Sequence, residues 1–244
     1  MYYCMELTCV IAAGGLGKRL QGFRDNDKTK VLLEVNNIPM ICQQIKQINS
    51  WGLDRFIIIT NPTFHSLIKD VTLSYFPNLN LDFVVQEEAK GISHALYQAK
   101  PYCENLEGKF LFVLGDNFFG ENPLSTISSN DLLNNNGCQI YTVEVENPTE
   151  YGVAIVDNYS NVIEIEEKPL NPKSDLAVVG IYLFDSNAFE YIDELQPSAR
   201  GEYEITDLIN IYIKKEICTN SELNSWWIDA GTPDRIEELE SKLL

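Results

Sequence analysis

The chain has 244 residues, of which 45% are hydrophobic and 22% charged, so it can bury a full core as one domain and has the composition of a globular enzyme. Its formal net charge of -18 at pH 7 disfavours binding to nucleic acid or anionic membranes, although a local cationic pocket can still hold a small phosphate ligand. The six cysteines form no C-x-x-C pair, no apolar run reaches membrane-spanning length, and the first residues lack a signal-peptide pattern. We therefore expect a cytoplasmic protein with reduced thiols and with neither a nucleic-acid nor a membrane partner.

An apolar run that ends in a glycine-rich turn opens the chain. Residues 7–12 are small or β-branched, which predicts a buried parallel strand. The turn that follows consists of Ala13, Gly14, Gly15, Leu16, Gly17, Lys18 and Arg19. Backbone N–H groups in such a turn, with two cations beside them, predict an anion site.

Two familiar phosphate-binding motifs do not match this turn. Ala12 stands where a Walker A loop needs its first glycine, and Arg19 stands where that loop has a hydroxyl. Leu20 stands where a dinucleotide-binding motif needs a third small residue. Taken alone, a tight structural turn between a strand and a helix explains the glycines about as well.

The first half of the chain alternates strands with helices. Residues 21–29 are polar and predict a loop before Lys30, which alone is typical of a solvated edge. Strands are predicted at 55–60, 81–86 and 109–117, and helices are predicted to begin near residues 39, 61 and 91. This alternation predicts an α/β fold with a doubly wound, mostly parallel, Rossmann-like mixed sheet and helices on both faces.

The second half is richer in strands. They are predicted at 140–145, 153–157, 162–167 and 178–184, and helices at 187–195, with Asn187 as the expected cap, at 203–215 and from Thr232 onward. No linker separates the halves, so we expect a single domain over 1–244, with 1–137 and a small β-rich part at 138–244 as its two portions.

Two acids follow strands that are distant in sequence. Asp116 ends the apolar run 111–114 and Asp229 ends the run 226–228, and each precedes a turn residue. An isolated aspartate after a strand is more often a helix cap, but a pair of carboxylates could hold Mg²⁺. The glycine turn, Gln86 and Asp116 are all predicted at carboxyl ends of strands, where ligands of such sheets gather.

Further charged residues suggest a second anion site. Glu167 and Lys168 end a predicted strand before a proline, and Arg200 lies just before a predicted helix. An exposed charged turn and ordinary helix capping are the simpler explanations of these residues. His65 and His94 lack the spacing of metal ligands, so we expect structural roles for them.

Taken in order, these motifs resemble the sugar-1-phosphate nucleotidyltransferases, and most closely their glucose-1-phosphate thymidylyltransferase branch. The residues that carry the resemblance are the glycine turn with Leu20, Lys30, Gly91, 114–117, 151–153, 166–169, 197–207 and 227–232. The resemblance implies an enzyme that joins dTTP to glucose 1-phosphate with Mg²⁺, giving dTDP-glucose and pyrophosphate for deoxysugar or glycan biosynthesis. It is also compatible with a homo-oligomer.

The resemblance also implies roles for individual residues. It implies that Arg19 and Lys30 are catalytic and that Asp116 and Asp229 bind the metal. The nucleotide is bound by Ala13, Gly14, Gly15, Gly17, Gln86 and Gly91. The sugar phosphate is bound by Asn117, Gly152, Glu167, Lys168, Tyr182 and Arg200.

Some positions depart from the family pattern. Lys18 replaces a usual Thr, Gln21 and Gly22 replace an aromatic-Pro step, and Val31 replaces a Gln that helps to recognise thymine. The chain also ends without the regulatory helices of longer thymidylyltransferases, so we expect no feedback site there. UTP- or CTP-dependent transfer, a glycosyltransferase of similar fold and a non-catalytic nucleotide-sugar-binding protein remain the alternatives.

Overall fold

The structure, a computed structural model, describes residues 7–15, 17–20, 22–23, 29–128, 132 and 136–244. Most of the loop expected at 21–29 lies outside the described residues, as do Leu16 and Gln21 of the quoted motifs. Nothing in the described part of the chain forms a helix that is both long enough and apolar enough to cross a membrane.

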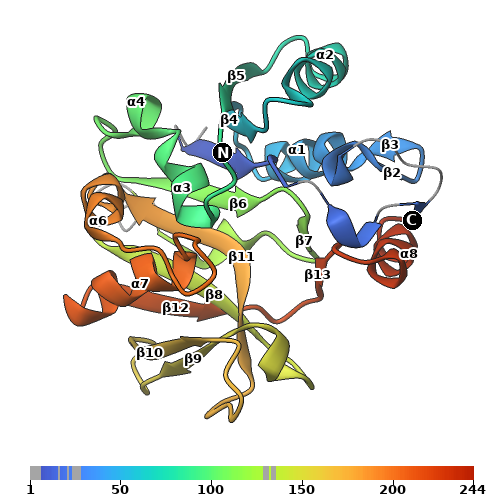
Figure 1. Cartoon of the computed structure of the whole chain (residues 1–244). Coiled ribbons are helices and arrows are strands. Elements are labelled where there is room, and N and C mark those ends of the chain that lie inside the picture. The colour runs from blue at the N-terminus through green and yellow to red at the C-terminus, as the bar shows by residue number, and fades with distance from the viewer. Residues whose placement is uncertain (1–6, 16, 21, 24–28, 129–131, 133–135) are drawn as a thin grey trace.

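Four parallel strands form one side of the main sheet, in the order β6-β1-β4-β5, with β5 at the edge (Figure 1). They are β6 (Lys109–Leu114), β1 (Thr8–Ala12), β4 (Arg55–Thr60) and β5 (Asn80–Val85). Each matches a strand expected from its apolar run. Because all four run the same way, their carboxyl ends meet at one edge of the sheet.

The sheet continues beyond β6 with strands of the second half. β11 (Leu176–Asp185) pairs antiparallel with β6, β8 (Cys138–Glu144) and β9 (Gly152–Val156), and β9 pairs with β10 (Val162–Glu167). The sequence did not predict β12 (Cys218–Glu222), a short polar strand that pairs parallel with β8. The sheet is therefore mixed, as expected.

Two small ribbons lie outside this sheet. β2 (Glu34–Val35) pairs with β3 (Ile38–Pro39), and β7 (Asn117–Phe119) pairs antiparallel with β13 (Trp227–Asp229). The second ribbon sets Asp229 opposite Asn117, although the two residues are far apart in the sequence.

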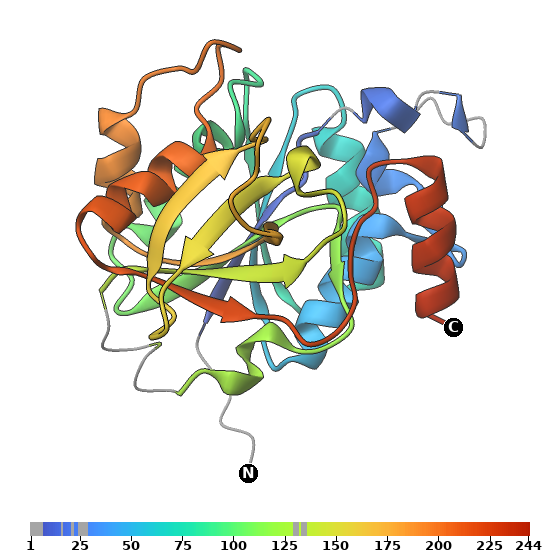
Figure 2. The ribbon, with the colours of Figure 1, turned by 90° about the horizontal axis from the view of Figure 1, so that it is seen from below.

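Helices cover both faces of the main sheet (Figures 1 and 2). The α-helices are α1 (Met40–Ser50), α2 (His65–Tyr75), α3 (Ile92–Tyr97), α4 (Lys100–Cys103), α6 (Ala188–Glu194), α7 (Ile205–Lys214) and α8 (Pro233–Lys242). Short 3-10 turns lie at Lys18–Leu20, Lys30–Leu32, Pro123–Thr126 and Pro148–Glu150.

The apolar core is split by the sheet into two layers. Cys9 and Ile11 of β1 pack with α1 and α2, whereas Val10 packs with α3, α6 and α7. Successive side chains of a strand point to opposite faces, so a continuous apolar strand fills both layers. The helix α8 closes a smaller cluster with Leu20 and Ile228.

Two expected helix starts differ from the structure. α2 begins at His65 rather than at residue 61, because Oδ1 of Asn61 accepts a hydrogen bond from N–H of Phe64 at 2.9 Å and holds a turn there. Asn187 has a helical backbone and makes no capping bond; its Nδ2 donates to Oδ2 of Asp185 at 3.0 Å instead.

Candidate active site

The glycine turn packs directly against the segment that carries Lys30. Gly17 has a φ of 62°, and a Cβ placed on it would lie 2.6 Å from Cβ of Lys30. Oγ1 of Thr29 donates to the carbonyl oxygen of Gly15 at 2.8 Å. A side chain at position 17 would thus be strained and would push Lys30 away, so glycine is required there for two reasons.

Lys30 lies between the two aspartates that were expected to bind metal. Its Nζ donates to Oδ2 of Asp116 and lies 3.6 Å from Oδ1 of Asp229. The Lys30 side chain is 8% exposed. The prediction from the local sequence that Lys30 lies on a solvated edge is therefore wrong. The fold buries this ammonium beside two acids that are distant in the sequence.

Asp116 is held in place by its neighbour Asn117. Nδ2 of Asn117 donates to Oδ1 of Asp116 at 2.7 Å, while its Oδ1 accepts from N–H of Gly180 at 3.0 Å and from Nε1 of Trp227 at 2.7 Å. Burial opposes ionisation, but the Lys30 ammonium and these hydrogen bonds hold the pKa of Asp116 below its ordinary value. Asn117 positions a carboxylate, and its contact with a sugar stays a prediction.

Asp229 ends β13 beside Arg19. A Cβ placed on Gly231 would lie 3.0 Å from Oδ1 of Asp229 and 3.0 Å from Nη2 of Arg19, so both side chains flank this glycine. Oδ1 of Asp229 is buried and accepts no hydrogen bond from the part of the chain that the structure describes. Burial and the Asp116 carboxylate raise the pKa of Asp229, against the opposing charges of Lys30 and Arg19.

The two aspartates fit a magnesium ion. Both carboxylates lie beside the Lys30 ammonium, so they face the same small region, and the buried Oδ1 of Asp229 accepts no hydrogen bond from any described residue. Mg²⁺ prefers carboxylate oxygens and is usually held by one or two of them together with phosphate and water. No group of three or more potential metal ligands occurs among the described residues. Side chains of these residues alone would therefore not fill the coordination shell of the ion.

A second charged cluster joins the end of β10 to the loop before α7. Nζ of Lys168 lies 3.9 Å from Oε1 of Glu167, and Nη2 of Arg200 lies 3.7 Å from the same oxygen. Arg200 is also held by Glu204 through bonds of 3.1 and 2.9 Å. Gly152 lies opposite Glu167 in the strand pairing, and a Cβ there would lie 3.4 Å from Oε2 of Glu167.

Tyr182, which was expected to bind the sugar phosphate, is buried in the main sheet. It belongs to β11, stacks on Phe112 with ring centroids 6.0 Å apart, and is 3% exposed. Burial raises the pKa of its hydroxyl, with further contributions from Glu167 and Asp116. The contact of Tyr182 with a sugar stays a prediction.

Gln86 follows β5 at the carboxyl edge of the sheet, near the glycine turn. A Cβ placed on Gly14 would lie 3.5 Å from Oε1 of Gln86. Gly91 has a φ of 102°, and a Cβ on it would lie 2.6 Å from the carbonyl oxygen of Tyr203, so no other residue fits there. Val31 is 3% exposed and packs in the core toward Gly115.

Sequence reasoning missed several residues that support the site. Glu204 clamps Arg200 from the position just before α7 and makes no side-chain capping bond there, whereas the local sequence suggested ordinary helix capping. Asn61 donates from Nδ2 to the carbonyl oxygen of Gly14 at 3.1 Å, and Trp227 donates to Asn117. These two contacts join distant segments, so no local sequence pattern predicts them.

Comparison with known proteins agrees with this geometry. The family described as "Nucleotidyl transferase" matches residues 8–244, and the chain belongs to this family. It is 33% identical to a glucose-1-phosphate thymidylyltransferase of Neisseria gonorrhoeae over 95% of this chain and 81% of that protein. It is 34% identical to the bifunctional protein GlmU of Methanococcus aeolicus, covering 93% of this chain and 52% of that protein.

The chain therefore spans about half the length of the GlmU relatives it matches. A solved structure of a candidate glucose-1-phosphate thymidylyltransferase from Bacillus anthracis, in complex with sucrose, has a TM-score of 0.85 to this chain. The two chains are 34% identical, and the match covers 96% of this chain and 94% of that one. The expected family and α/β fold are thereby confirmed.

Proposed function

We propose that the chain is a sugar-1-phosphate nucleotidyltransferase that uses Mg²⁺, with dTTP and glucose 1-phosphate as substrates and dTDP-glucose and pyrophosphate as products. The observation that carries the proposal is the placement of Lys30 between Asp116 and Asp229, directly under the glycine turn. A nucleoside triphosphate needs such a combination of backbone N–H groups, cations and metal-binding acids.

In the proposed reaction, an oxygen of the sugar phosphate attacks the α-phosphorus of the nucleotide. A new P–O bond forms there, the bond to the oxygen that bridges to the β-phosphorus breaks, and pyrophosphate leaves with that oxygen. The chain's task is to align the two phosphates and to stabilise negative charge. The glycine turn, Arg19 and Lys30 would hold the triphosphate.

Asp116 and Asp229 would hold the magnesium ion. The ion supplies positive charge to the attacking and leaving oxygens when it is bound. Asn117 keeps Asp116 in one orientation through its 2.7 Å bond. The Lys30 ammonium lies beside both acids and is positioned to contact a phosphate bound next to them.

The second cluster would bind the sugar phosphate. Lys168 and Arg200 bring two cations to one edge of Glu167, which suits a phosphate on one side and a sugar hydroxyl on the other. Gly152, Tyr182 and Asn117 would complete the sugar pocket. In this arrangement residues 1–137 bind the nucleotide and residues 138–244 bind the sugar phosphate.

The base would lie against Gln86 and Gly91, and UTP is the competing substrate. Val31 is buried and cannot hydrogen-bond to thymine. A relative named UTP--glucose-1-phosphate uridylyltransferase AglF, from Haloferax volcanii, is 28% identical over 97% of this chain and 96% of that protein. The first observation removes a contact that would support dTTP, and the printed name of this relative makes UTP the second candidate.

Pyrophosphate release tests the proposal. The protein is incubated with Mg²⁺, glucose 1-phosphate and each of dTTP, UTP, CTP, ATP and GTP in turn. We expect the highest kcat/KM with dTTP. A higher kcat/KM with UTP would make UTP the substrate and leave the proposed reaction unchanged. If no nucleotide gives pyrophosphate release with any sugar 1-phosphate of a panel, the proposed function is contradicted.

A further inference from the structure

The amide of Gln86 is held from two sides by groups that accept hydrogen bonds. Its Nε2 donates to the carbonyl oxygen of Gly91 at 3.2 Å and lies 3.0 Å from Nδ1 of His94. A carbonyl can only accept, so the nitrogen must face Gly91. The second N–H of the amide then points at His94, whose Nδ1 must be the acceptor.

This arrangement leaves the oxygen of Gln86 for another partner. Oε1 faces the glycine turn near Gly14, and no described residue donates a hydrogen bond to it. Gln86 as a whole is 8% exposed. The predicted base site thus presents a fixed acceptor, and an amide in the opposite orientation would present a donor.

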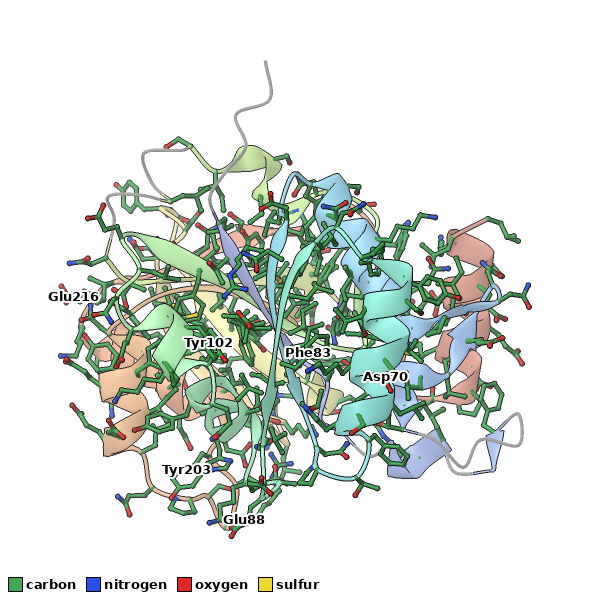
Figure 3. All side chains as sticks on the ribbon, turned by 90° about the horizontal axis from the view of Figure 1, so that it is seen from above. Asp70, Phe83, Glu88, Tyr102, Tyr203 and Glu216 are labelled. Atoms are coloured by element: carbon green, nitrogen blue, oxygen red, sulfur yellow. The ribbon has the colours of Figure 1, made fainter. Side chains whose placement is uncertain are left out.

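The ring of His94 is built into its surroundings. It stacks on Tyr203 with ring centroids 6.2 Å apart, and N–H of the neighbouring Ser93 donates to the carbonyl oxygen of Tyr203 at 3.1 Å. Figure 3 shows Tyr203 and Glu88 at the same edge of the molecule. The contacts fix the ring, so its Nδ1 stays directed at Gln86.

His94 is able to change its charge. It borders a pocket of about 240 Å³, and the titratable groups around it are Glu88 and Lys90 before α3, Tyr97 of α3, Asp193 of α6 and Tyr203 before α7. Burial, together with Lys90, lowers the pKa of His94 below its ordinary value, against the opposing charge of Glu88. The neutral ring that Gln86 requires is therefore the form present at neutral pH.

We infer that His94 is a positioning residue for base selection, which orients the Gln86 amide so that Oε1 accepts a hydrogen bond from a base N–H. This inference rests on the proposed function, in which Gln86 faces the base. Uracil and thymine carry a hydrogen on N3, whereas N3 of cytosine is an acceptor. The fixed oxygen thus favours UTP and dTTP over CTP and does not distinguish UTP from dTTP.

Two variants separate orientation from packing. His94→Phe keeps an aromatic ring against Tyr203 but removes the acceptor, so the ratio of kcat/KM for UTP to that for CTP should fall about tenfold or more. His94→Asn offers Oδ1 near the position of Nδ1 and should largely restore the ratio. We expect kcat at saturating UTP to change less than about threefold in both, because Lys30 and the two aspartates are untouched.

The pH dependence gives a second readout. Protonated His94 would place an N–H against the Gln86 amide, so the UTP-to-CTP ratio of the wild type should fall as pH drops through the pKa of His94. His94→Asn should not show this step. An unchanged ratio in His94→Phe, or the same pH step in His94→Asn, would overturn the inference.

A spectroscopic measurement tests the orientation without turnover. The chain has two histidines, so ring nitrogen signals in long-range ¹H–¹⁵N spectra can be assigned with the His94→Asn variant. We expect a neutral His94 ring with its hydrogen on Nε2, and a hydrogen on Nδ1 would contradict the inference. Loss of pyrophosphate release with every nucleotide contradicts the proposed function, whereas a wild type that turns over but has an Nδ1–H ring contradicts only the role of His94.

Discussion

The two charged clusters of the site differ in how tightly the fold holds them. Lys30 is 8% exposed between Asp116 and Asp229, at the carboxyl edge of the parallel strands. Lys168 and Arg200 are 51% and 50% exposed, on a turn after β10 and on the loop before α7. The clusters differ mainly in their cations: the Lys30 ammonium is shielded from solvent, although the Asp116 and Asp229 side chains are 27% and 32% exposed, whereas solvent screens Lys168 and Arg200.

The difference in burial indicates which part of the proposed reaction each cluster serves. A preformed, buried arrangement suits the reacting phosphates, because charges fixed in advance need no rearrangement in the transition state. An open, screened arrangement suits binding and release of a variable sugar phosphate. Substitutions should therefore affect kcat most in the buried cluster and KM most in the open one.

Replacing Lys30 should have the largest effect. Lys30→Ala removes the ammonium beside both aspartates, and we expect kcat/KM to fall by about 100-fold to 1,000-fold in pyrophosphate release. Lys46→Ala is the matched control, because Lys46 is exposed on α1. Circular dichroism should show both variants folded, and near-normal turnover of folded Lys30→Ala would contradict the assignment.

Removing the charge of Asp229 should be the next largest change. Asp229→Asn keeps the shape but weakens the predicted metal site, so we expect turnover to fall by about 100-fold and the Mg²⁺ concentration for half-maximal rate to rise. Titration of activity with Mg²⁺ measures both. The exposed Asp234 of α8 provides the control variant Asp234→Asn, and an unaltered Mg²⁺ requirement in Asp229→Asn would argue against this ligand.

Truncating Arg200 should separate the clusters. Arg200→Ala removes one cation of the open cluster, and we expect KM for the sugar 1-phosphate to rise about tenfold with a smaller change in kcat. Lys173→Ala is the control, since Lys173 pairs with Glu164 at 2.6 Å on the same β-rich part. An equal rise in KM for the nucleotide would show that Arg200 does not belong to the sugar-phosphate site.

The smallest effect concerns stability. Burial raises the pKa of Glu167, although Lys168 and Arg200 oppose the shift, so the folded protein binds this proton more tightly than the unfolded chain does. Stability should therefore decrease as pH rises from about 4.5 through the raised pKa of Glu167. Glu167→Gln should lose this component, with a difference of about 0.5 kcal/mol or less after screening by solvent.

Thermal unfolding of the ligand-free protein between about pH 4 and about pH 8 measures this difference. Glu166→Gln, a substitution of an exposed residue on the same strand, controls for a general loss of negative charge. A pH profile of Glu167→Gln that coincides with that of the wild type would show that Glu167 is not desolvated in the folded chain.

Most strands and helices, the glycine turn and the two acids of the candidate site were predictable from the sequence alone. Continuous apolar runs such as 55–60 can be satisfied only by strands buried on both faces, and alternating helices then order them into a parallel sheet. Gly17 was predictable as part of a sharp turn because glycines follow an apolar run there, and its φ of 62° agrees with this. Asp116 and Asp229 were recognisable because each ends an apolar run.

The contacts between these elements and residues could be known only from the tertiary structure. The polar strand β12 has no apolar signature, and it forms because β8 offers it an edge. Lys30 is buried because Asp116 and Asp229, which lie far from it in the sequence, compensate its charge. Gln86 and His94 are only eight residues apart, but their bond follows no helical or strand spacing, because it depends on the conformation of the loop between β5 and α3. Local sequence sets backbone preference and burial, whereas the partners of a polar side chain are fixed by the packing of distant segments.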